Sequence, residues 1–339
     1  MYPWTETHLQ LLKNLYIHVP KCMTRKIAII DMGTNTFHLL IAEATGNGYT
    51  IIHRERTAVK IGKGGINQGY ITEEGMTRAL LAMQSFKNTL DEQGIKNVKA
   101  FGTSALRNAV NGVEVLHRIK NVCGIDTTII SGDVEAEYIY HGVRYSLDMG
   151  KEKSLIMDIG GGSVECILGH GSQIFWKESF EIGAQRLLEE FHKHEPITGE
   201  EVHRLDQHFR RKLDSLFEAL RQYPAKVLIG ASGTFDTLSD IYCYRNNISK
   251  SDDQPETPLT IDGFCSIYAE LISKNREQRM QIRGMFEMRV DMIVVACCLV
   301  RYVLAHHSFN RIRVSSYSLK EGVLASCIEA PKPVEPSIL

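Results

Sequence analysis

Two short stretches of the sequence place an acidic residue beside glycine and hydroxyl residues at the end of an apolar run. Asp158 follows the run at 154–157, with Glu165 just beyond, and Asp31 follows the run at 27–30. Adjacent glycines expose backbone N–H groups to an anion, whereas acids would repel phosphate unless a divalent cation lay between them. The pattern predicts a Mg²⁺-dependent phosphate site, with Asp158 and Glu165 as metal ligands and Asp31 opposite them. The predicted phosphate-binding residues of the two loops are Gly33, Thr34, Asn35, Thr36, Gly160, Gly161, Gly162 and Ser163.

Other segments carry residues for which two interpretations stay open. Glu135 lies in the first turn of a predicted helix, where it either complements the helix dipole or acts as a general base toward water. Arg107 follows a Thr-Ser turn and is either a solvated surface residue or a bidentate phosphate ligand. For His38, which alternates with apolar neighbours, we favour a packed role over catalysis. A third loop after an apolar strand adds possible phosphate contacts from Ser232, Gly233 and Thr234.

The elements that must position these residues occur twice. In each copy a buried strand ends in Asp-x-Gly, a second strand runs back, and a turn leads into a third strand. The first copy covers residues 27–53 and the second covers residues 154–176. Such an internal duplication predicts two similar α/β domains facing each other across a cleft. Ligands in open α/β sheets bind beyond the carboxyl ends of the strands, which is where Asp31 and Asp158 lie.

The duplication and the intervening helical periodicity give a domain organisation. We expect an N-terminal domain over 25–150 and a C-terminal domain over 151–330. The last helix, at about 318–328, is expected to pack back on the first domain. Residues 1–24 are expected to be an extension and 331–339 a disordered tail. Residues 244–260 are polar and predict a surface loop, and a helix is predicted over 288–306.

Composition narrows the class of protein. The chain has 339 residues, of which 43% are hydrophobic and 23% charged, and its net charge is −1. The net charge of the chain therefore attracts neither nucleic acid nor a membrane surface. The eight cysteines are scattered, as is typical of reduced, buried residues in a cytoplasmic protein. No long apolar run predicts a membrane span and no secretory signal is evident, so we expect a cytoplasmic location.

These motifs follow one another along the chain in an order that resembles the exopolyphosphatase/guanosine pentaphosphate phosphohydrolase family. The resemblance runs from about residue 26 to residue 325 and implies two ribonuclease-H-like domains of the actin and sugar-kinase superfamily. It also implies Mg²⁺-dependent hydrolysis of the terminal phosphate of polyphosphate or guanosine pentaphosphate, and it admits a homodimer. The segments that carry it are 31–39, 103–107, 131–136, 158–165 and 231–234.

Carried over by position, the resemblance assigns roles to the candidate residues. Glu135 matches the catalytic base, and Asp158 and Glu165 match acids linked to metal and water. Arg107 and the glycine-rich loops match phosphate contacts. Because the chain ends before a further helical region with a His-Asp motif, it resembles the short, two-domain form.

Three departures from the family pattern stand out. Val134 replaces the first of two glutamates that often precede the alanine. Near the C-terminus the common Ser-Asp-Gly-Ala-Leu-Arg-Glu-Gly appears as Ser-Ser-Tyr-Ser-Leu-Lys-Glu-Gly at 315–322. Without that Gly and Arg, a basic or flexible role for this turn is in doubt. Phe286 also stands near the place where relatives often have proline ahead of an Arg-x-Asp motif.

We therefore expect an exopolyphosphatase in which water attacks the terminal phosphoryl group, with Glu135, Arg107 and Glu165 as the catalytic residues. Guanosine pentaphosphate hydrolysis is the nearest alternative. An ATPase or kinase of the same fold would need an adenosine pocket, for which the 230–234 loop is a candidate part. A non-catalytic sensor of polyphosphate or nucleotide is the non-enzyme alternative, and retention of Glu135 argues against it.

Overall fold

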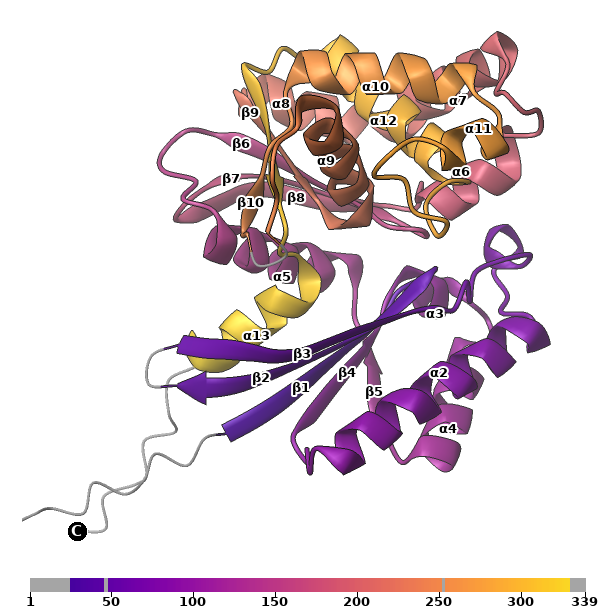
Figure 1. Ribbon diagram of the computed structural model, residues 1–339, viewed down its shortest axis with the longest axis vertical. Helices are drawn as coiled ribbons and strands as arrows, with labels where there is room; N and C mark the ends of the chain where they lie inside the picture. Colours follow the sequence, from indigo (N-terminus) through magenta and orange to yellow (C-terminus); the bar gives the residue numbers. More distant parts are fainter. Residues whose placement is uncertain (1–24, 46–47, 252–253, 330–339) are drawn as a thin grey trace, which may run out of the picture.

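The computed structural model describes residues 25–45, 48–251 and 254–329. The expected extension at 1–24 and tail at 331–339 lie outside the described residues. Two lobes, each built on one sheet, are stacked along the long axis of the molecule (Figure 1). Among the described residues, no helix is both long and apolar enough to cross a membrane.

The first lobe is a five-stranded sheet in the order β3-β2-β1-β4-β5. Strands β1, β4 and β5 are parallel to one another, while β2 and β3 are antiparallel to their neighbours. Its elements are β1 (Arg25–Met32), β2 (Thr36–Thr45), β3 (Gly48–Ala58), the 3-10 turn η1 (Ile66–Gln68), α2 (Glu73–Glu92), β4 (Val98–Gly102), α3 (Ser104–Asn108), α4 (Gly112–Cys123), β5 (Thr127–Ile129) and α5 (Gly132–Ser146).

The second lobe repeats this order with one extra edge strand. Its sheet runs β10-β11-β9-β6-β7-β8, so that β8-β7-β6-β9-β11 corresponds to the first sheet. The elements are β6 (Ser154–Ile159), β7 (Val164–His170), β8 (Gln173–Phe180), α6 (Ala184–Phe191), α7 (Gly199–Lys212), α8 (Asp214–Gln222), β9 (Val227–Ala231), α9 (Ser232–Asn246), β10 (Glu256–Thr257), α10 (Ile261–Ser273), α11 (Arg276–Met280), α12 (Ile293–His306) and β11 (Arg311–Ser315). A final helix, α13 (Leu319–Glu329), follows.

The duplication holds at the level of individual strand pairs. In the first lobe Asp31 pairs across to His38, which pairs with Arg56 on β3. In the second lobe Asp158 pairs with Glu165, which pairs with Ser179 on β8. The predicted pair of duplicated ribonuclease-H-like domains is therefore confirmed. Each domain carries a row of three side chains across its first three strands.

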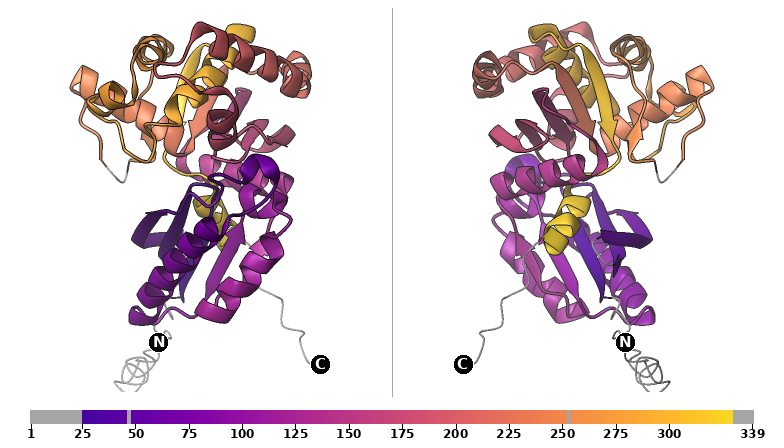
Figure 2. Two further views of the ribbon diagram at one scale, coloured as in Figure 1. Left: turned by 90° about the vertical axis from the view of Figure 1, so that its right-hand side faces the viewer. Right: turned by 90° about the vertical axis from the view of Figure 1, so that its left-hand side faces the viewer.

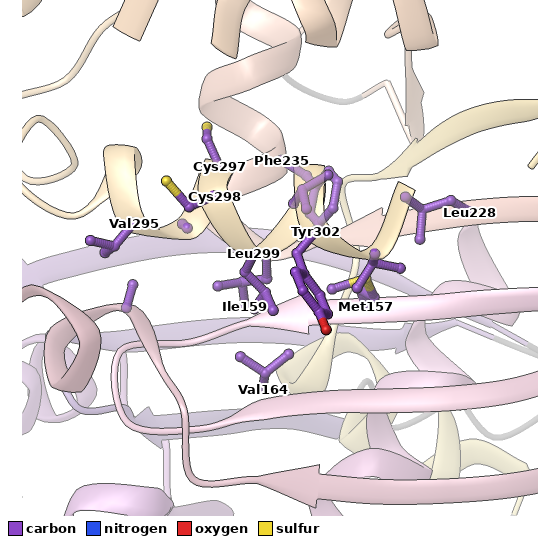
Figure 3. Close-up of a cluster of buried hydrophobic side chains, with 14 of the residues drawn as sticks. Met157, Ile159, Val164, Leu228, Phe235, Val295, Cys297, Cys298, Leu299 and Tyr302 are labelled. Atoms are coloured by element: carbon purple, nitrogen blue, oxygen red, sulfur yellow. The ribbon is translucent and has the colours of Figure 1, made fainter. Parts of the chain in front are cut away.

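Two predicted elements differ in detail. The helix predicted from residue 288 begins at Ile293, and residues 287–292 before it form turns. The predicted loop at 244–260 contains the short strand β10, which pairs with β11. Within the second lobe, Leu299 and Tyr302 of α12 face the strands that carry Met157 and Val164 (Figure 3). Cys297 and Cys298 are free and buried there, as the sequence predicted.

Helices α5 and α13 pack against each other where the two lobes meet. Helix α13 also contacts β1, and the views in Figures 1 and 2 both show it beside the first lobe. The crossing requires glycine on both helices. A Cβ at Gly322 would lie 1.7 Å from the Tyr138 carbonyl oxygen, and one at Gly142 would lie 2.1 Å from the Ser318 carbonyl oxygen.

We expect Gly322→Ala to destabilise the protein, because a methyl group there meets the backbone of α5 and the helices must separate. Overpacking of this kind costs typically about 1–3 kcal/mol, so the free energy of unfolding in urea should fall by at least ~1 kcal/mol. The matched control is Gly199→Ala at the start of α7, where nothing lies within 4 Å of the added carbon. Equal stability of the two variants would contradict the close crossing.

Candidate active site

The two predicted phosphate loops meet face to face between the lobes. A Cβ at Gly161 would lie 2.5 Å from the Asn35 Nδ2 atom. A Cβ at Gly162 would lie 2.5 Å from the hydroxyl oxygens of both Thr34 and Ser104. Because these partners belong to the first lobe, glycine at both positions is what permits the loops to approach so closely.

Beside the loops lies a cavity of about 840 Å³ with walls from both lobes. Most predicted site residues line it. Arg107 and Thr234 are not part of its wall: Arg107 lies behind Glu135, and the Thr234 hydroxyl faces the Ile159 carbonyl oxygen at 3.5 Å. The predicted residues that do line the cavity are Asp31, Gly33, Thr34, Asn35, Thr36, Glu135, Asp158, Gly160, Gly161, Gly162, Ser163, Glu165, Ser232 and Gly233.

Asp158 is buried at the end of β6 and held by two hydroxyl groups. Its Oδ2 atom accepts hydrogen bonds from Ser232 Oγ at 2.7 Å and from the Ser318 hydroxyl. Burial raises the pKa of Asp158, although both hydroxyls oppose that shift. Ser232 has a φ of 66°, a left-handed conformation that is strained for serine and typical of functional sites. The turn into α9 thus directs a hydroxyl at the acid.

Asp31 is the corresponding acid of the first lobe, and it is less well satisfied. Its Oδ1 atom is buried and has no hydrogen-bond partner among the described residues. Burial raises the pKa of Asp31 to about 7, with Asp158 and Glu321 adding to the rise and Lys320 opposing it. A buried carboxyl oxygen without a donor is a position that a cation or a bound water would satisfy.

Glu135 reaches the cavity from the first turn of α5. The Ser131 hydroxyl caps this helix by accepting from the Val134 amide at 3.3 Å. Arg107 Nη1 donates to Glu135 Oε2 at 2.8 Å and to the Ile130 carbonyl at 3.1 Å. Burial and the charge of Glu165 nevertheless raise the pKa of Glu135 well above its usual range. Arg107 therefore fixes the carboxylate rather than contacting the cavity.

Glu165 completes the acidic end of the cavity. It is 1% exposed and accepts from Ser179 Oγ at 2.7 Å. Burial and the neighbouring Asp158 raise the pKa of Glu165 to about 7, against the opposing effects of Ser179, Ser163 and Arg107. Carboxyl groups whose pKa values lie near neutrality are suited to exchange protons with water at cellular pH.

Several cationic residues of the cavity were not found from the sequence. Arg56 enters from β3, Arg289 lies against Gly233, whose added Cβ would be 2.0 Å from Nη2, and Lys320 comes from the start of α13. Burial alone would lower the pKa of Lys320, but Glu321, Asp31 and Asp236 raise it. Arg54 and Lys250 also line the cavity.

Two of these cations had a signal in the sequence. Lys320 occupies the position of the arginine in the common form of the 315–322 motif, so this turn keeps a cation. Arg289 belongs to the Arg-x-Asp motif that the sequence displayed. Arg56 had none, because its place beside His38 depends on strand register. His38 itself lines the cavity, and burial together with Lys320, Arg289 and Arg56 lowers its pKa well below the usual value, which keeps it neutral.

The acids fit a magnesium ion that is shared with a phosphate ligand better than a closed protein cage. Within the described ranges, no three His, Cys, Asp or Glu side chains converge into a ready-made metal site. Mg²⁺, however, usually keeps several waters and takes one or two carboxylates together with substrate phosphates. The unpartnered Asp31 Oδ1 atom and the buried Asp158 across the cavity are donors of the kind that such an ion takes.

Comparison with known proteins agrees with this geometry. The model of the Ppx/GppA phosphatase family matches residues 40–330. A crystal structure of an exopolyphosphatase from Cytophaga hutchinsonii is 43% identical, covers 91% of this chain and 99% of its own, and superposes with a TM-score of 0.88. The Aquifex aeolicus member of the Ppx/GppA family is 27% identical, covers 90% and 97% of the two chains, and gives a TM-score of 0.74.

The family match over residues 40–330 and the shared fold therefore lead to one assignment. This chain belongs to the Ppx/GppA phosphatase family.

Proposed function

We propose that this protein is an exopolyphosphatase that hydrolyses the terminal phosphate of inorganic polyphosphate. The observation that carries the proposal is the pair Glu135 and Glu165, two buried carboxyls with raised pKa values beside two phosphate-type loops. The similarity to the Cytophaga hutchinsonii exopolyphosphatase supports the same substrate class.

In this mechanism Glu135 orients a water molecule in line with the terminal phosphorus and takes its proton. Arg107 holds the carboxylate of Glu135 from behind the cavity wall. Loop amides neutralise charge on the phosphoryl oxygens, and Arg289 and Lys320 face the negatively charged chain. Asp158, Glu165 and Asp31 would hold Mg²⁺, which supplies further charge neutralisation at the phosphates.

A second candidate substrate, guanosine pentaphosphate, is favoured by one feature of the cavity. Tyr244, Ile248 and Phe286 line it and remain exposed. Aromatic side chains of this kind stack on nucleobases. The same phosphate chemistry would then act on a nucleotide whose base rests against this apolar rim.

The substrate assignment is tested by phosphate release from polyphosphate, guanosine pentaphosphate and ATP, each with Mg²⁺ and with a chelator. We expect Mg²⁺-dependent release that is fastest from polyphosphate. Faster release from guanosine pentaphosphate would select the second candidate. Release from ATP alone would contradict both, and polyphosphate binding without release would indicate a sensor.

The role of Glu135 is tested by Glu135→Gln, which keeps the size of the side chain but removes the base. Loss of a general base typically costs about 10²–10⁴ in rate, so kcat should fall by at least ~100-fold while circular dichroism stays unchanged. Glu137→Gln is the matched control, because Glu137 lies on the same helix and pairs with Lys177 at the surface. An undiminished kcat in folded Glu135→Gln would remove Glu135 from the mechanism.

The proposed metal site predicts a pH-dependent response to Mg²⁺. A carboxyl with a raised folded-state pKa stabilises the fold below its unfolded pKa, and this contribution is lost as pH rises through the folded value. For Asp31 the window runs from 3.8 to about 7, so the metal-free protein loses stability across it. Because a carboxyl group binds a metal ion in its ionised form, Mg²⁺ should raise Tm more at pH 8 than at pH 5.

Asp31→Asn should abolish most of that Mg²⁺ response and should not lower Tm in the absence of metal at pH 8, because it removes a poorly satisfied buried charge. Asp236→Asn serves as the control, since Asp236 lines the same cavity but faces Lys250, Lys320 and Arg289. A full Mg²⁺ response in Asp31→Asn would exclude Asp31 as a ligand.

A further inference from the structure

Glu181, in the short connection between β8 and α6, contacts residues of both lobes. Its Oε1 atom accepts from Arg107 Nη2 at 3.2 Å. Its Oε2 atom accepts from Ser104 Oγ at 2.6 Å and from Arg186 Nη2 at 3.1 Å. Ser104 and Arg107 belong to the first lobe, whereas Glu181 and Arg186 belong to the second. One carboxylate therefore joins both sides of the cleft.

Arg186 extends this connection in two directions. Its Nε atom donates to the Gly162 carbonyl at 2.8 Å, within the glycine loop of the second lobe. Its Nη1 atom donates to the Ile66 carbonyl at 2.8 Å, in the first lobe. The side chain is only 13% exposed, so the guanidinium is held between the lobes rather than solvated.

At the other end, Arg107 lies between two carboxylates. Nη1 contacts Glu135 of its own lobe and Nη2 contacts Glu181 of the opposite lobe. A continuous chain of contacts thus runs from Ile66 through Arg186, Glu181 and Arg107 to Glu135. Arg107 and Glu181 also line a second pocket of about 260 Å³, which shares no lining residue with the main cavity.

We propose that Glu181 is a positioning residue that makes the placement of Glu135 depend on closure of the two lobes. The inference rests on the proposed function, because it assigns Glu135 the role of base. With the lobes closed, Glu181 holds the Nη2 atom of Arg107. The guanidinium group then has one orientation, in which Nη1 donates to Glu135. With the lobes apart, Arg107 loses that anchor and Glu135 loses its fixed direction.

Glu181 acts by orienting Arg107, and the stability that its ion pairs contribute is the smaller effect. The Glu181 side chain is 39% exposed, and ion pairs that contact solvent contribute little to stability. A misplaced catalytic group, in contrast, costs as much as about 10²-fold in rate for a shift of ~1 Å. The effect of removing Glu181 should consequently appear in kcat far more than in folding.

The test uses the full chain with polyphosphate and Mg²⁺. We expect Glu181→Ala to lower kcat by at least ~10-fold with KM changed less than ~3-fold, since positioning acts on the chemical step. In an Arg107→Ala background, Glu181→Ala should have little further effect, because residues that act through one another are not additive. Fully additive effects, or an unchanged kcat in Glu181→Ala, would overturn the proposal.

Two matched variants separate this role from general effects. Glu178→Ala removes an acid that lines the same small pocket but is not among the hydrogen-bond partners of Arg107, and it should leave kcat unchanged. Glu189→Ala removes a different inter-lobe contact, the bond from the Gly64 amide to Glu189 Oε1 at 2.9 Å. A loss of kcat in Glu189→Ala equal to that in Glu181→Ala would show that any inter-lobe contact suffices, and would overturn the specific role of Glu181.

Hydrogen exchange measures the link without any substrate. Glu181→Ala and Arg186→Ala should both speed exchange in the peptide covering 62–70, relative to wild type and Glu178→Ala. If wild-type protein releases no phosphate from any substrate, the proposed function fails while this readout still decides whether Glu181 holds the lobes together. Unchanged exchange in Glu181→Ala would refute the link.

Discussion

Four carboxyl groups that share one cleft repel one another, and much of this molecule is arranged to hold them there. Asp31, Glu135, Asp158 and Glu165 all have pKa values raised by burial. Moving any of them to the surface would relieve that cost. They stay because each is fixed at the end of a strand or the start of a helix, and because hydroxyls, Arg107 and Lys320 offset part of the repulsion. The remaining deficit of positive charge is what a phosphate-bound cation would supply.

The duplicated framework makes this arrangement possible without making it symmetric. Equivalent strand positions carry Asp31, His38 and Arg56 in one lobe, and Asp158, Glu165 and Ser179 in the other. One copy has therefore placed a neutral ring and a cation where the other has an acid and a hydroxyl. The same backbone geometry thus gives the cleft two chemically different walls.

A feature of the fold or of the site could be predicted from the sequence when the residues that indicate it lie close together in the chain. Each strand-end acid lies within a few residues of its glycine loop, and the same local pattern occurs twice, so the fold, the cleft and its acidic end could be predicted. Arg56 and the contact of Glu181 with Arg107 depend on register and on how the lobes meet. Lys320 looked like the loss of a cation, yet its ammonium group faces the same acids. Arg107 was expected at the phosphates because a guanidinium beside a glycine loop suits them, but Glu135 and Glu181 engage it instead.

The crossing of α5 and α13 has a consequence for how the chain is made. Helix α13 is the last described element, yet its Val323 and Leu324 share an apolar cluster with Ile29 of β1 and Ile139 of α5. During synthesis the N-terminal half leaves the ribosome long before these partners do. The face of the first lobe that α13 covers therefore stays open until residues 319–329 have been translated, whereas the core on its other face consists only of residues between 28 and 125. Domain-by-domain folding from the N-terminus is the usual course for a two-domain chain; in this protein the first lobe can form one of its apolar faces early, but the other face is completed only when α13 packs on it.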